Sequence, residues 1–196
     1  MLIGVVGLNG SGKDTFAKYL VERHGFAHRD IGKEVRDELE RRERNQQDRN
    51  EMIKVANEMR HRFGASYWCR KALDGKKAEN LVITSLRNPS EIEEIKSRGG
   101  AIVEVYADAE VRFERTMKRI SIDPSSHGDV KSFESFLEME RKELENADPA
   151  AQQLLKCISM AEYRVDNNGS KEHLSKAVEG LLQELKGKGR DLKMKR

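Results

Sequence analysis

A glycine-rich loop near the start of the chain carries its clearest chemical signal. Residues 7–15 read Gly-Leu-Asn-Gly-Ser-Gly-Lys-Asp-Thr and match the Walker A phosphate-binding pattern. Glycines let a backbone curl so that successive N–H groups point at an anion, and a helix that begins there adds its positive dipole end. Lys13 would then reach the β- and γ-phosphates of ATP. We therefore expect the nucleotide to be bound by Asn9, Gly10, Ser11, Gly12, Lys13, Asp14 and Thr15.

The residue after the loop lysine departs from the usual pattern. A Ser or Thr hydroxyl normally stands there and binds Mg²⁺, whereas this chain has Asp14, followed by Thr15. A carboxylate is a good hard-oxygen ligand for Mg²⁺. We expect Asp14 and Thr15 to hold the ion. The alternative is that Asp14 only stabilises the first turn of its helix.

The elements that position this loop follow from the pattern of the whole chain. Short apolar runs alternate with helical stretches, which is typical of βαβ units and a parallel sheet. The loop follows such a run and opens a helix over 13–24. The predicted fold class is therefore α/β, a five-stranded parallel sheet with helices on both faces. Strands are predicted at 2–6, 26–29, 80–84, 101–106 and 163–166.

Helix signals fill the intervals between these strands. Asn88-Pro89 gives a capping residue followed by a proline at the first helical position, and Gly99-Gly100 closes that helix. Further helices are predicted to begin at residues 108 and 170. An apolar stripe over 48–63 predicts a helix whose stripe packs against the core; it consists of Met52, Val55, Met59 and Phe63.

Composition excludes several classes of protein. The chain has 196 residues, 37% hydrophobic and 36% charged, which suits one domain with a heavily charged surface. Its apolar runs are too short to span a membrane, and two cysteines do not make a disulfide framework. We expect a cytoplasmic protein. The net charge of +3 arises from residues 186–196, which hold six Lys or Arg and one Asp. We expect these residues to form a frayed basic tail rather than to bind nucleic acid.

The loop residues Ser-Gly-Lys-Asp-Thr (11–15) resemble those of deoxynucleoside monophosphate kinases and, more broadly, of the adenylate kinase and dephospho-coenzyme A kinase group. The resemblance extends over residues 1 to about 185. It implies a single P-loop domain with the P-loop NTPase three-layer fold, and ATP and Mg²⁺ as cofactors. It also implies a helical acceptor-binding insertion at about 31–73 and a short lid at about 115–135.

The same resemblance implies an acceptor site at the ends of two strands. Gly32 and Arg36 match a stretch whose arginine binds the acceptor's phosphate in such kinases, and Arg87 stands near the transferred phosphate. Guanidinium groups suit phosphates because they bind them through two parallel hydrogen bonds. Tyr67 is expected to line the acceptor cleft, although core packing suits it equally well. Thr84 stands where these kinases often have an aspartate.

Two further regions would complete the site. Arg112, Arg115 and Arg119 share one helix face, and Arg115 and Arg119 best match the arginines that close over the phosphates in the family. Asn167 and Gly169 lie in the loop that runs beside the adenine base in the wider family. A solvated helix face and a simple turn are the alternatives for these two regions.

These observations predict a kinase that moves the γ-phosphoryl group of ATP to a small phosphorylated acceptor, most plainly a (deoxy)nucleoside monophosphate. The catalytic residues are then Lys13, Arg87, Arg115 and Arg119. A first alternative is a dephospho-coenzyme A kinase, whose hydroxyl acceptor needs a base, and Asp30 is placed to serve as one. A second is a nucleotide-binding regulator with slow ATPase activity, which the missing aspartate at Thr84 would suit. We expect a monomer or a homodimer.

Overall fold

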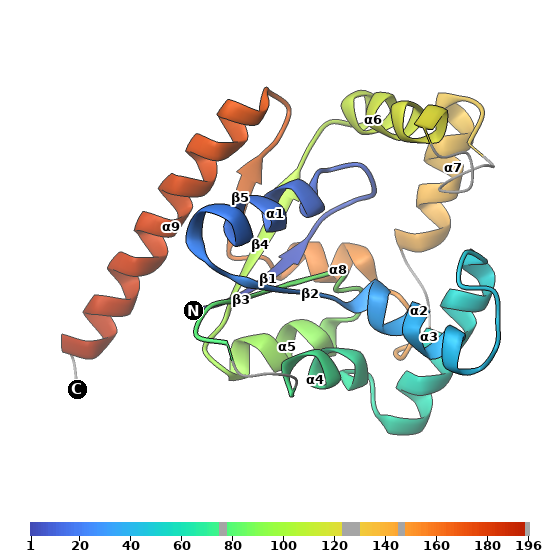
Figure 1. The fold of residues 1–196 in the computed structure, drawn as a ribbon, viewed down its shortest axis with the longest axis horizontal. Coiled ribbons are helices and arrows are strands. Elements are labelled where there is room, and N and C mark those ends of the chain that lie inside the picture. Colours follow the sequence, from blue (N-terminus) through green and yellow to red (C-terminus); the bar gives the residue numbers. More distant parts are fainter. Residues whose placement is uncertain (75–77, 123–129, 145–147, 195–196) are drawn as a thin grey trace.

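The computed structural model describes residues 1–74, 78–122, 130–144 and 148–194. Its centre is a parallel sheet in the order β2-β3-β1-β4-β5 (Figure 1). The predicted five-stranded parallel sheet is therefore confirmed. The strands are β1 (Leu2–Val6), β2 (Ala27–Asp30), β3 (Leu81–Thr84), β4 (Ala101–Tyr106) and β5 (Tyr163–Asp166).

Helices cover both faces of the sheet, as predicted. On one face α1 (Lys13–His24) and α9 (Lys171–Met194) share an apolar core with the strands. On the other face α5 (Pro89–Ser97) and α8 (Leu154–Ser159) do the same. The capping signals at Asn88 act as expected, because its side chain and that of Glu91 form a capping box on α5.

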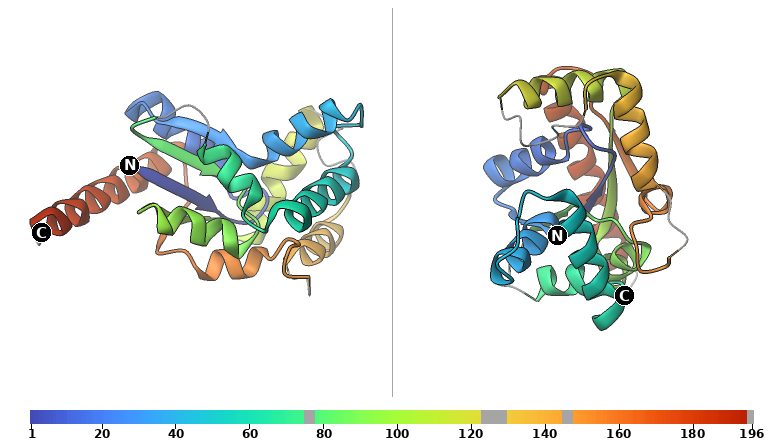
Figure 2. Two further views of the ribbon diagram at one scale, coloured as in Figure 1. Left: turned by 90° about the horizontal axis from the view of Figure 1, so that it is seen from below. Right: turned by 90° about the vertical axis from the view of Figure 1, so that its right-hand side faces the viewer.

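Two groups of helices stand at the carboxyl ends of the strands. The segment between β2 and β3 forms α2 (Ile31–Arg41) and α3 (Arg49–Phe63) there, followed by α4 (Tyr67–Leu73), which packs on α5. After β4 come α6 (Ala109–Ile122) and α7 (Phe133–Leu144). Figures 1 and 2 show that the two groups face one another beyond the end of the sheet. Because all five strands are parallel, their carboxyl ends open toward the space between these groups.

The bounds of some segments differ from the sequence predictions. The second strand is shifted by one residue, to Ala27–Asp30, from the predicted 26–29. The predicted lid at about 115–135 includes residues 123–129, which lie outside the described residues. The predicted basic tail, residues 186–196, begins within α9, which continues to Met194 and whose last turns project from the body (Figure 2).

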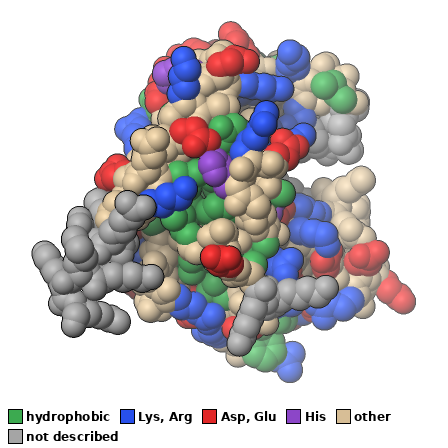
Figure 3. All heavy atoms as spheres, turned by 60° about the vertical axis from the view of Figure 1, so that its left-hand side comes forward, with side chains coloured by type: hydrophobic (Ala, Val, Ile, Leu, Met, Phe, Trp, Pro, Cys, Tyr) green, Lys and Arg blue, Asp and Glu red, His purple; other side chains and the backbone are tan. Residues whose placement is uncertain are grey.

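The surface agrees with the composition. On the face shown in Figure 3, charged side chains surround the apolar ones. Among the described residues no helix is both long and apolar enough to cross a membrane. Both cysteines, Cys69 and Cys157, are free and buried, and burial raises the pKa of each thiol. They are therefore protonated core residues at neutral pH.

The packing of α1 supplies a test of the fold. Phe16 is 0% exposed beneath the sheet, whereas Val21 on the same helix is 38% exposed. Phe16→Ala should lower the free energy of unfolding by about 3–5 kcal/mol, because it leaves a cavity. Val21→Ala is the matched control and should change it by about 0.5 kcal/mol or less. Urea unfolding checks both. Equal small effects would show that α1 does not pack here as described.

Candidate active site

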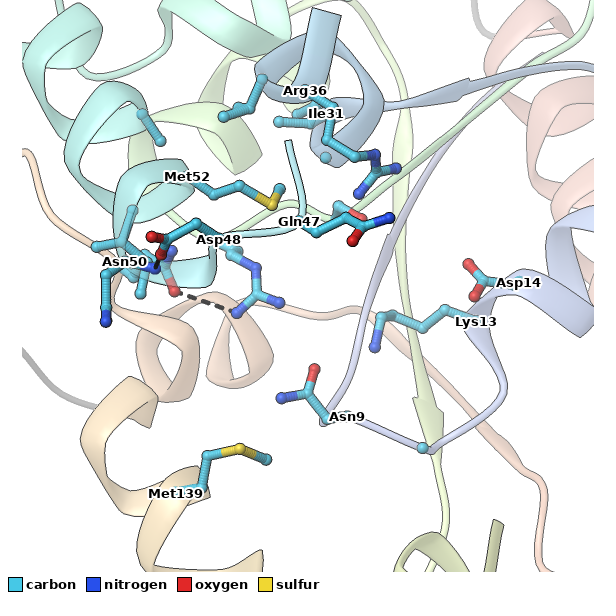
Figure 4. A pocket seen from close by; sticks show the side chains of 18 of the residues that line it. Asn9, Lys13, Asp14, Ile31, Arg36, Gln47, Asp48, Asn50, Met52 and Met139 are labelled. Carbon is cyan, nitrogen blue, oxygen red and sulfur yellow. Dashed lines mark hydrogen bonds between the residues drawn. The ribbon is translucent and has the colours of Figure 1, made fainter. Parts of the chain in front are cut away.

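A cavity of about 550 Å³ opens at the carboxyl ends of the strands. One end is the loop between β1 and α1, and the other is formed by α2 and α3, while Met139 of α7 lies on the side of Asn9 (Figure 4). Its lining includes most residues predicted to bind nucleotide or acceptor. These are Asn9, Gly10, Gly12, Lys13, Asp14, Thr15, Gly32, Arg36, Arg87 and Arg119.

The phosphate loop is packed so tightly that two of its glycines cannot be replaced without strain. Gly10 and Gly12 have φ angles of 79° and 98°. A Cβ at Gly12 would lie 2.1 Å from Asn167 Nδ2, and one at Gly10 would lie 2.7 Å from the carbonyl oxygen of Arg112. The loop therefore owes its shape to β5 and α6 as well as to its own sequence.

Lys13 is the charged centre of the loop. Its Nζ donates to the carbonyl oxygens of Gly7 (2.8 Å) and Leu8 (2.9 Å). The pKa of Lys13 is lowered to about 7, mainly by burial and also by the charge of Arg87, while Asp14 opposes the shift. Arg119 and Arg112 also lower this pKa. So many cationic groups around one loop form an anion site, because a polyphosphate would relieve their mutual repulsion.

Two donors beside the loop are buried without a partner in the described part of the chain: Ser11 Oγ and Arg115 Nη1. The neighbouring Arg115 Nη2 donates to the carbonyl oxygen of Asn167 (2.7 Å), and Asn167 Nδ2 donates to that of Ser11 (2.7 Å). Buried donors are normally satisfied, so unpaired ones fit a site that receives an acceptor-rich ligand. A nucleotide supplies such acceptors.

The predicted lid arginines divide into different roles. Arg119 lines the cavity, whereas Arg115 lies against Asn167 beside the loop and does not line it. Arg112 is 4% exposed; it donates to the carbonyl oxygen of Asn9 (3.3 Å) and forms an ion pair with Glu140 on α7. It therefore braces the loop. Gly169 lies against His173 and also stands outside the cavity lining.

Arg87 is held at the cavity by a buried ion pair that the sequence did not reveal. Arg60 donates to Glu91 Oε1 at 3.2 and 2.9 Å, and the two side chains are 2% and 0% exposed. The other oxygen of Glu91 accepts the backbone N–H groups of Arg87 (2.8 Å) and Asn88 (3.1 Å). Arg87 Nη1 also donates to Gln152 (3.1 Å). The position of Arg87 is thus fixed through its backbone and its side chain.

The acceptor end combines polar and apolar side chains. Asp30 caps α2, and Arg36 Nη2 donates to its Oδ2 at 2.8 Å. Sequence reasoning missed several lining residues. Met52 belongs to the predicted apolar stripe, but only Val55 and Met59 of that stripe are buried in the core, and Phe63 is exposed. The missed lining residues also include Arg60, Ser85, Met139 and Gln152.

Of the two readings that the sequence left open for Tyr67, the structure favours core packing. Its ring stacks on Phe63 at a centroid distance of 5.1 Å and meets the edge of Trp68 at 5.0 Å. It does not line the cavity at the carboxyl ends of the strands. Tyr67 opens α4, which packs on α5, and this places it away from the acceptor end.

The donor set at the loop fits Mg²⁺ bound together with a nucleotide. Asp14 and Thr15 are exposed and line the cavity. Within the described ranges no three His, Cys, Asp or Glu side chains form a metal cage. Mg²⁺ does not require one, because it keeps several waters and is usually held by one or two carboxylates plus phosphate oxygens.

Thr84 does not replace the carboxylate found at its position in related kinases. Its side chain is 0% exposed, and its Oγ1 lies 2.8 Å from His28 Nε2 on the neighbouring strand. A buried hydroxyl that is hydrogen-bonded to a histidine does not supply the negative charge that a carboxylate would offer to a metal ion. Asp14 is consequently the carboxylate that lines the loop end of the cavity.

The lowered pKa of Lys13 predicts proton uptake on nucleotide binding. At about pH 8 the free protein holds Lys13 mostly neutral, since its pKa is about 7, and phosphate charge will raise that pKa. The binding of ATP should therefore be accompanied by the uptake of close to one proton near that pH and of much less near pH 6. Calorimetry in buffers of different ionisation enthalpy measures this difference. Lys13→Met is the control and should abolish the pH-dependent uptake. Equal uptake in the variant would refute the assignment.

Comparison with known proteins agrees with this geometry. Residues 3–143 match a family model described as an AAA domain. The chain is 30% identical over 187 residues to a UPF0200 protein of Pyrobaculum aerophilum, with 94% of each protein covered. It is 29% identical over 197 residues to one of Thermococcus kodakarensis, covering 94% of this chain and 98% of the relative. Its fold is that of P-loop kinases, for example shikimate kinase from Bacteroides thetaiotaomicron (TM-score 0.60, 16% identity, 95% and 98% covered). The chain therefore belongs to the AAA-domain family and to the UPF0200 proteins.

Proposed function

We propose that this protein is an ATP-dependent kinase whose acceptor is a phosphorylated small molecule of the (deoxy)nucleoside monophosphate class. The carrying observation is the two-ended cavity. Lys13, Arg87 and Arg119 gather at the phosphate-loop end, and Arg36 stands at the other end with its guanidinium directed inward (Figure 4). Cations at both ends of one cavity suit a triphosphate donor that meets a phosphate acceptor.

The side chains that line the acceptor end favour an acceptor that carries a flat, apolar group. Met52 of α3 lines this part of the cavity, and Met139 of α7 lines the cavity on the side of Asn9 (Figure 4). Thioether side chains adapt to an aromatic ring and make favourable contacts with it. Gln47 and Asn50 supply amide groups that could pair with the edge of a base. The remaining apolar lining consists of Ile31, Val35, Ile53 and Ala56.

The reaction needs no strong base when the acceptor is a phosphate. An acceptor oxygen, already ionised, attacks the γ-phosphorus while the bond to the β–γ bridging oxygen breaks and ADP leaves with that electron pair. Negative charge spreads over the equatorial oxygens, where Lys13, Arg87 and Arg119 would stabilise it. Mg²⁺, when bound at Asp14 and Thr15, would neutralise charge on the β- and γ-phosphates.

The two alternatives make different demands on the site. A hydroxyl acceptor, as in a dephospho-coenzyme A kinase, requires a free base, but Asp30 accepts hydrogen bonds from Arg36, Ser85 and the N–H of Gly32. A regulator with slow ATPase activity would need no acceptor end at all. A screen of ATP consumption with all nucleoside monophosphates, their deoxy forms and dephospho-coenzyme A separates the three. We also propose that the protein acts in the cytoplasm, as a monomer or homodimer.

Arginine variants should divide the acceptor's contacts from those of the transferred group. Losing a charge-assisted hydrogen bond costs about 1.5–3 kcal/mol, which corresponds to roughly 10- to 150-fold in kcat/KM. Arg87→Ala should act mainly on kcat and Arg36→Ala mainly on the acceptor's KM. Lys33→Ala is the control, since Lys33 is on the same helix and pairs with Asp37 in solvent. Steady-state kinetics with the best acceptor of the screen measures all three. Normal kinetics in both arginine variants would contradict the proposal.

A further inference from the structure

Ser85 is held in a backbone conformation that favours glycine. It directly follows β3, lines the cavity, and has a φ of 64°. An L-residue is strained in this left-handed region, because its Cβ approaches the carbonyl oxygen, whereas glycine is not. Among the described residues other than glycine, Glu43 also has a positive φ, at 55°. Backbone strain at a residue that lines a cavity indicates that its side chain has a role there.

The side chain of Ser85 supplies a short hydrogen bond to Asp30. Its Oγ donates to Asp30 Oδ1 at 2.6 Å, and the N–H of Gly32 donates to the same oxygen at 2.9 Å. The other oxygen, Oδ2, accepts from Arg36 Nη2 at 2.8 Å. A Cβ at Gly32 would lie 3.2 Å from Oδ1, so the backbone of Gly32 packs closely against the carboxylate of Asp30. Three donors from three places thus fix the orientation of Asp30.

Arg36 is the member of this chain of contacts that faces the cavity together with Ser85. It lines the cavity, whereas Asp30 does not, and its side chain is 41% exposed. A half-exposed arginine has many rotamers, and ordering it is costly on binding. Its bond to Asp30 uses one of five N–H donors. Enough donors stay available for an anion in the cavity.

We propose that Ser85 and Asp30 are positioning residues that hold Arg36 ready for the phosphate monoester of the acceptor. Asp30 therefore serves as an anchor for Arg36 and does not act as a base. The strained backbone of Ser85 is retained because it aims the hydroxyl at Asp30, which a glycine could not do. The identity of the acceptor rests on the proposed function, but the ordering of Arg36 does not.

The first test reads the ordering of Arg36 without any acceptor. In ¹⁵N NMR spectra of the free protein, the Nε–H signal of Arg36, assigned by its loss in Arg36→Lys, should report a rigid group. Ser85→Gly and Ser85→Ala should both make it mobile. Glu43→Gly is the matched control: it relieves the same left-handed backbone conformation but should leave the Arg36 signal unchanged. An equally rigid Arg36 in Ser85→Gly would overturn the proposal.

The second test reads the consequence for binding. Calorimetry follows AMP, GMP, CMP and UMP entering protein saturated with a non-hydrolysable ATP analogue. For whichever probe binds, Ser85→Ala and Asp30→Asn should each weaken binding on the order of tenfold. Neither should add to the effect of Arg36→Ala, because both act through Arg36. Additive losses would overturn the proposal.

Kinetics separates a failure of this inference from a failure of the proposed function. A loss of kcat in Asp30→Asn on the order of a hundredfold or more, with an unchanged acceptor KM, would identify Asp30 as a base and overturn the positioning role. If none of the four monophosphates binds while Ser85→Gly still mobilises Arg36, the proposed acceptor class is wrong and the positioning role stands.

Discussion

The buried ammonium of Lys13 is the group on which the rest of the site depends. It is held by two carbonyl oxygens of its own loop, and burial together with the charges of Arg87, Arg119 and Arg112 lowers its pKa to about 7. A protein does not gain stability from gathering cations around a desolvated ammonium. The arrangement makes physical sense as a receptor for a polyphosphate, whose charge would satisfy all of them together.

The rest of the molecule holds that receptor in place. Arg112 ties the phosphate loop to Glu140 on α7, Asn167 ties it to the end of β5, and Glu91 fixes the backbone beside Arg87. These ties come from α6 and α7 beyond the carboxyl edge of the sheet, from the end of β5, and from α5 on one face. The two groups of helices then enclose a cavity with cations at each end, and Met139 of α7 stands directly beside Glu140 in the chain. The same packed elements therefore position both the donor end and the acceptor end of the cavity.

The sequence predicted the features that depend on local pattern. The phosphate loop, the parallel sheet and the capping of α5 each follow from neighbouring residues, and so the structure confirms them. The sequence did not predict the features that depend on contacts between residues far apart in the chain. Arg115 lies against Asn167, 52 residues away, and Arg60 meets Glu91, 31 residues away. The sequence left Tyr67 open between the cleft and the core, because an aromatic residue type alone does not indicate which neighbours it packs against. Serine does not indicate a strained backbone from its residue type, so the positive φ of Ser85 is visible only in the structure.

The central claim is that the γ-phosphoryl group passes to an acceptor's phosphate, and ³¹P NMR of the product tests it most directly. The protein would be incubated with ATP, Mg²⁺ and the acceptor that most stimulates ATP consumption. The account predicts that a new pair of coupled phosphorus signals appears as ATP is consumed, because the acceptor's phosphate becomes a diphosphate. A product with an isolated phosphomonoester signal would show transfer to a hydroxyl group, and inorganic phosphate alone would show hydrolysis. Either result would contradict the account.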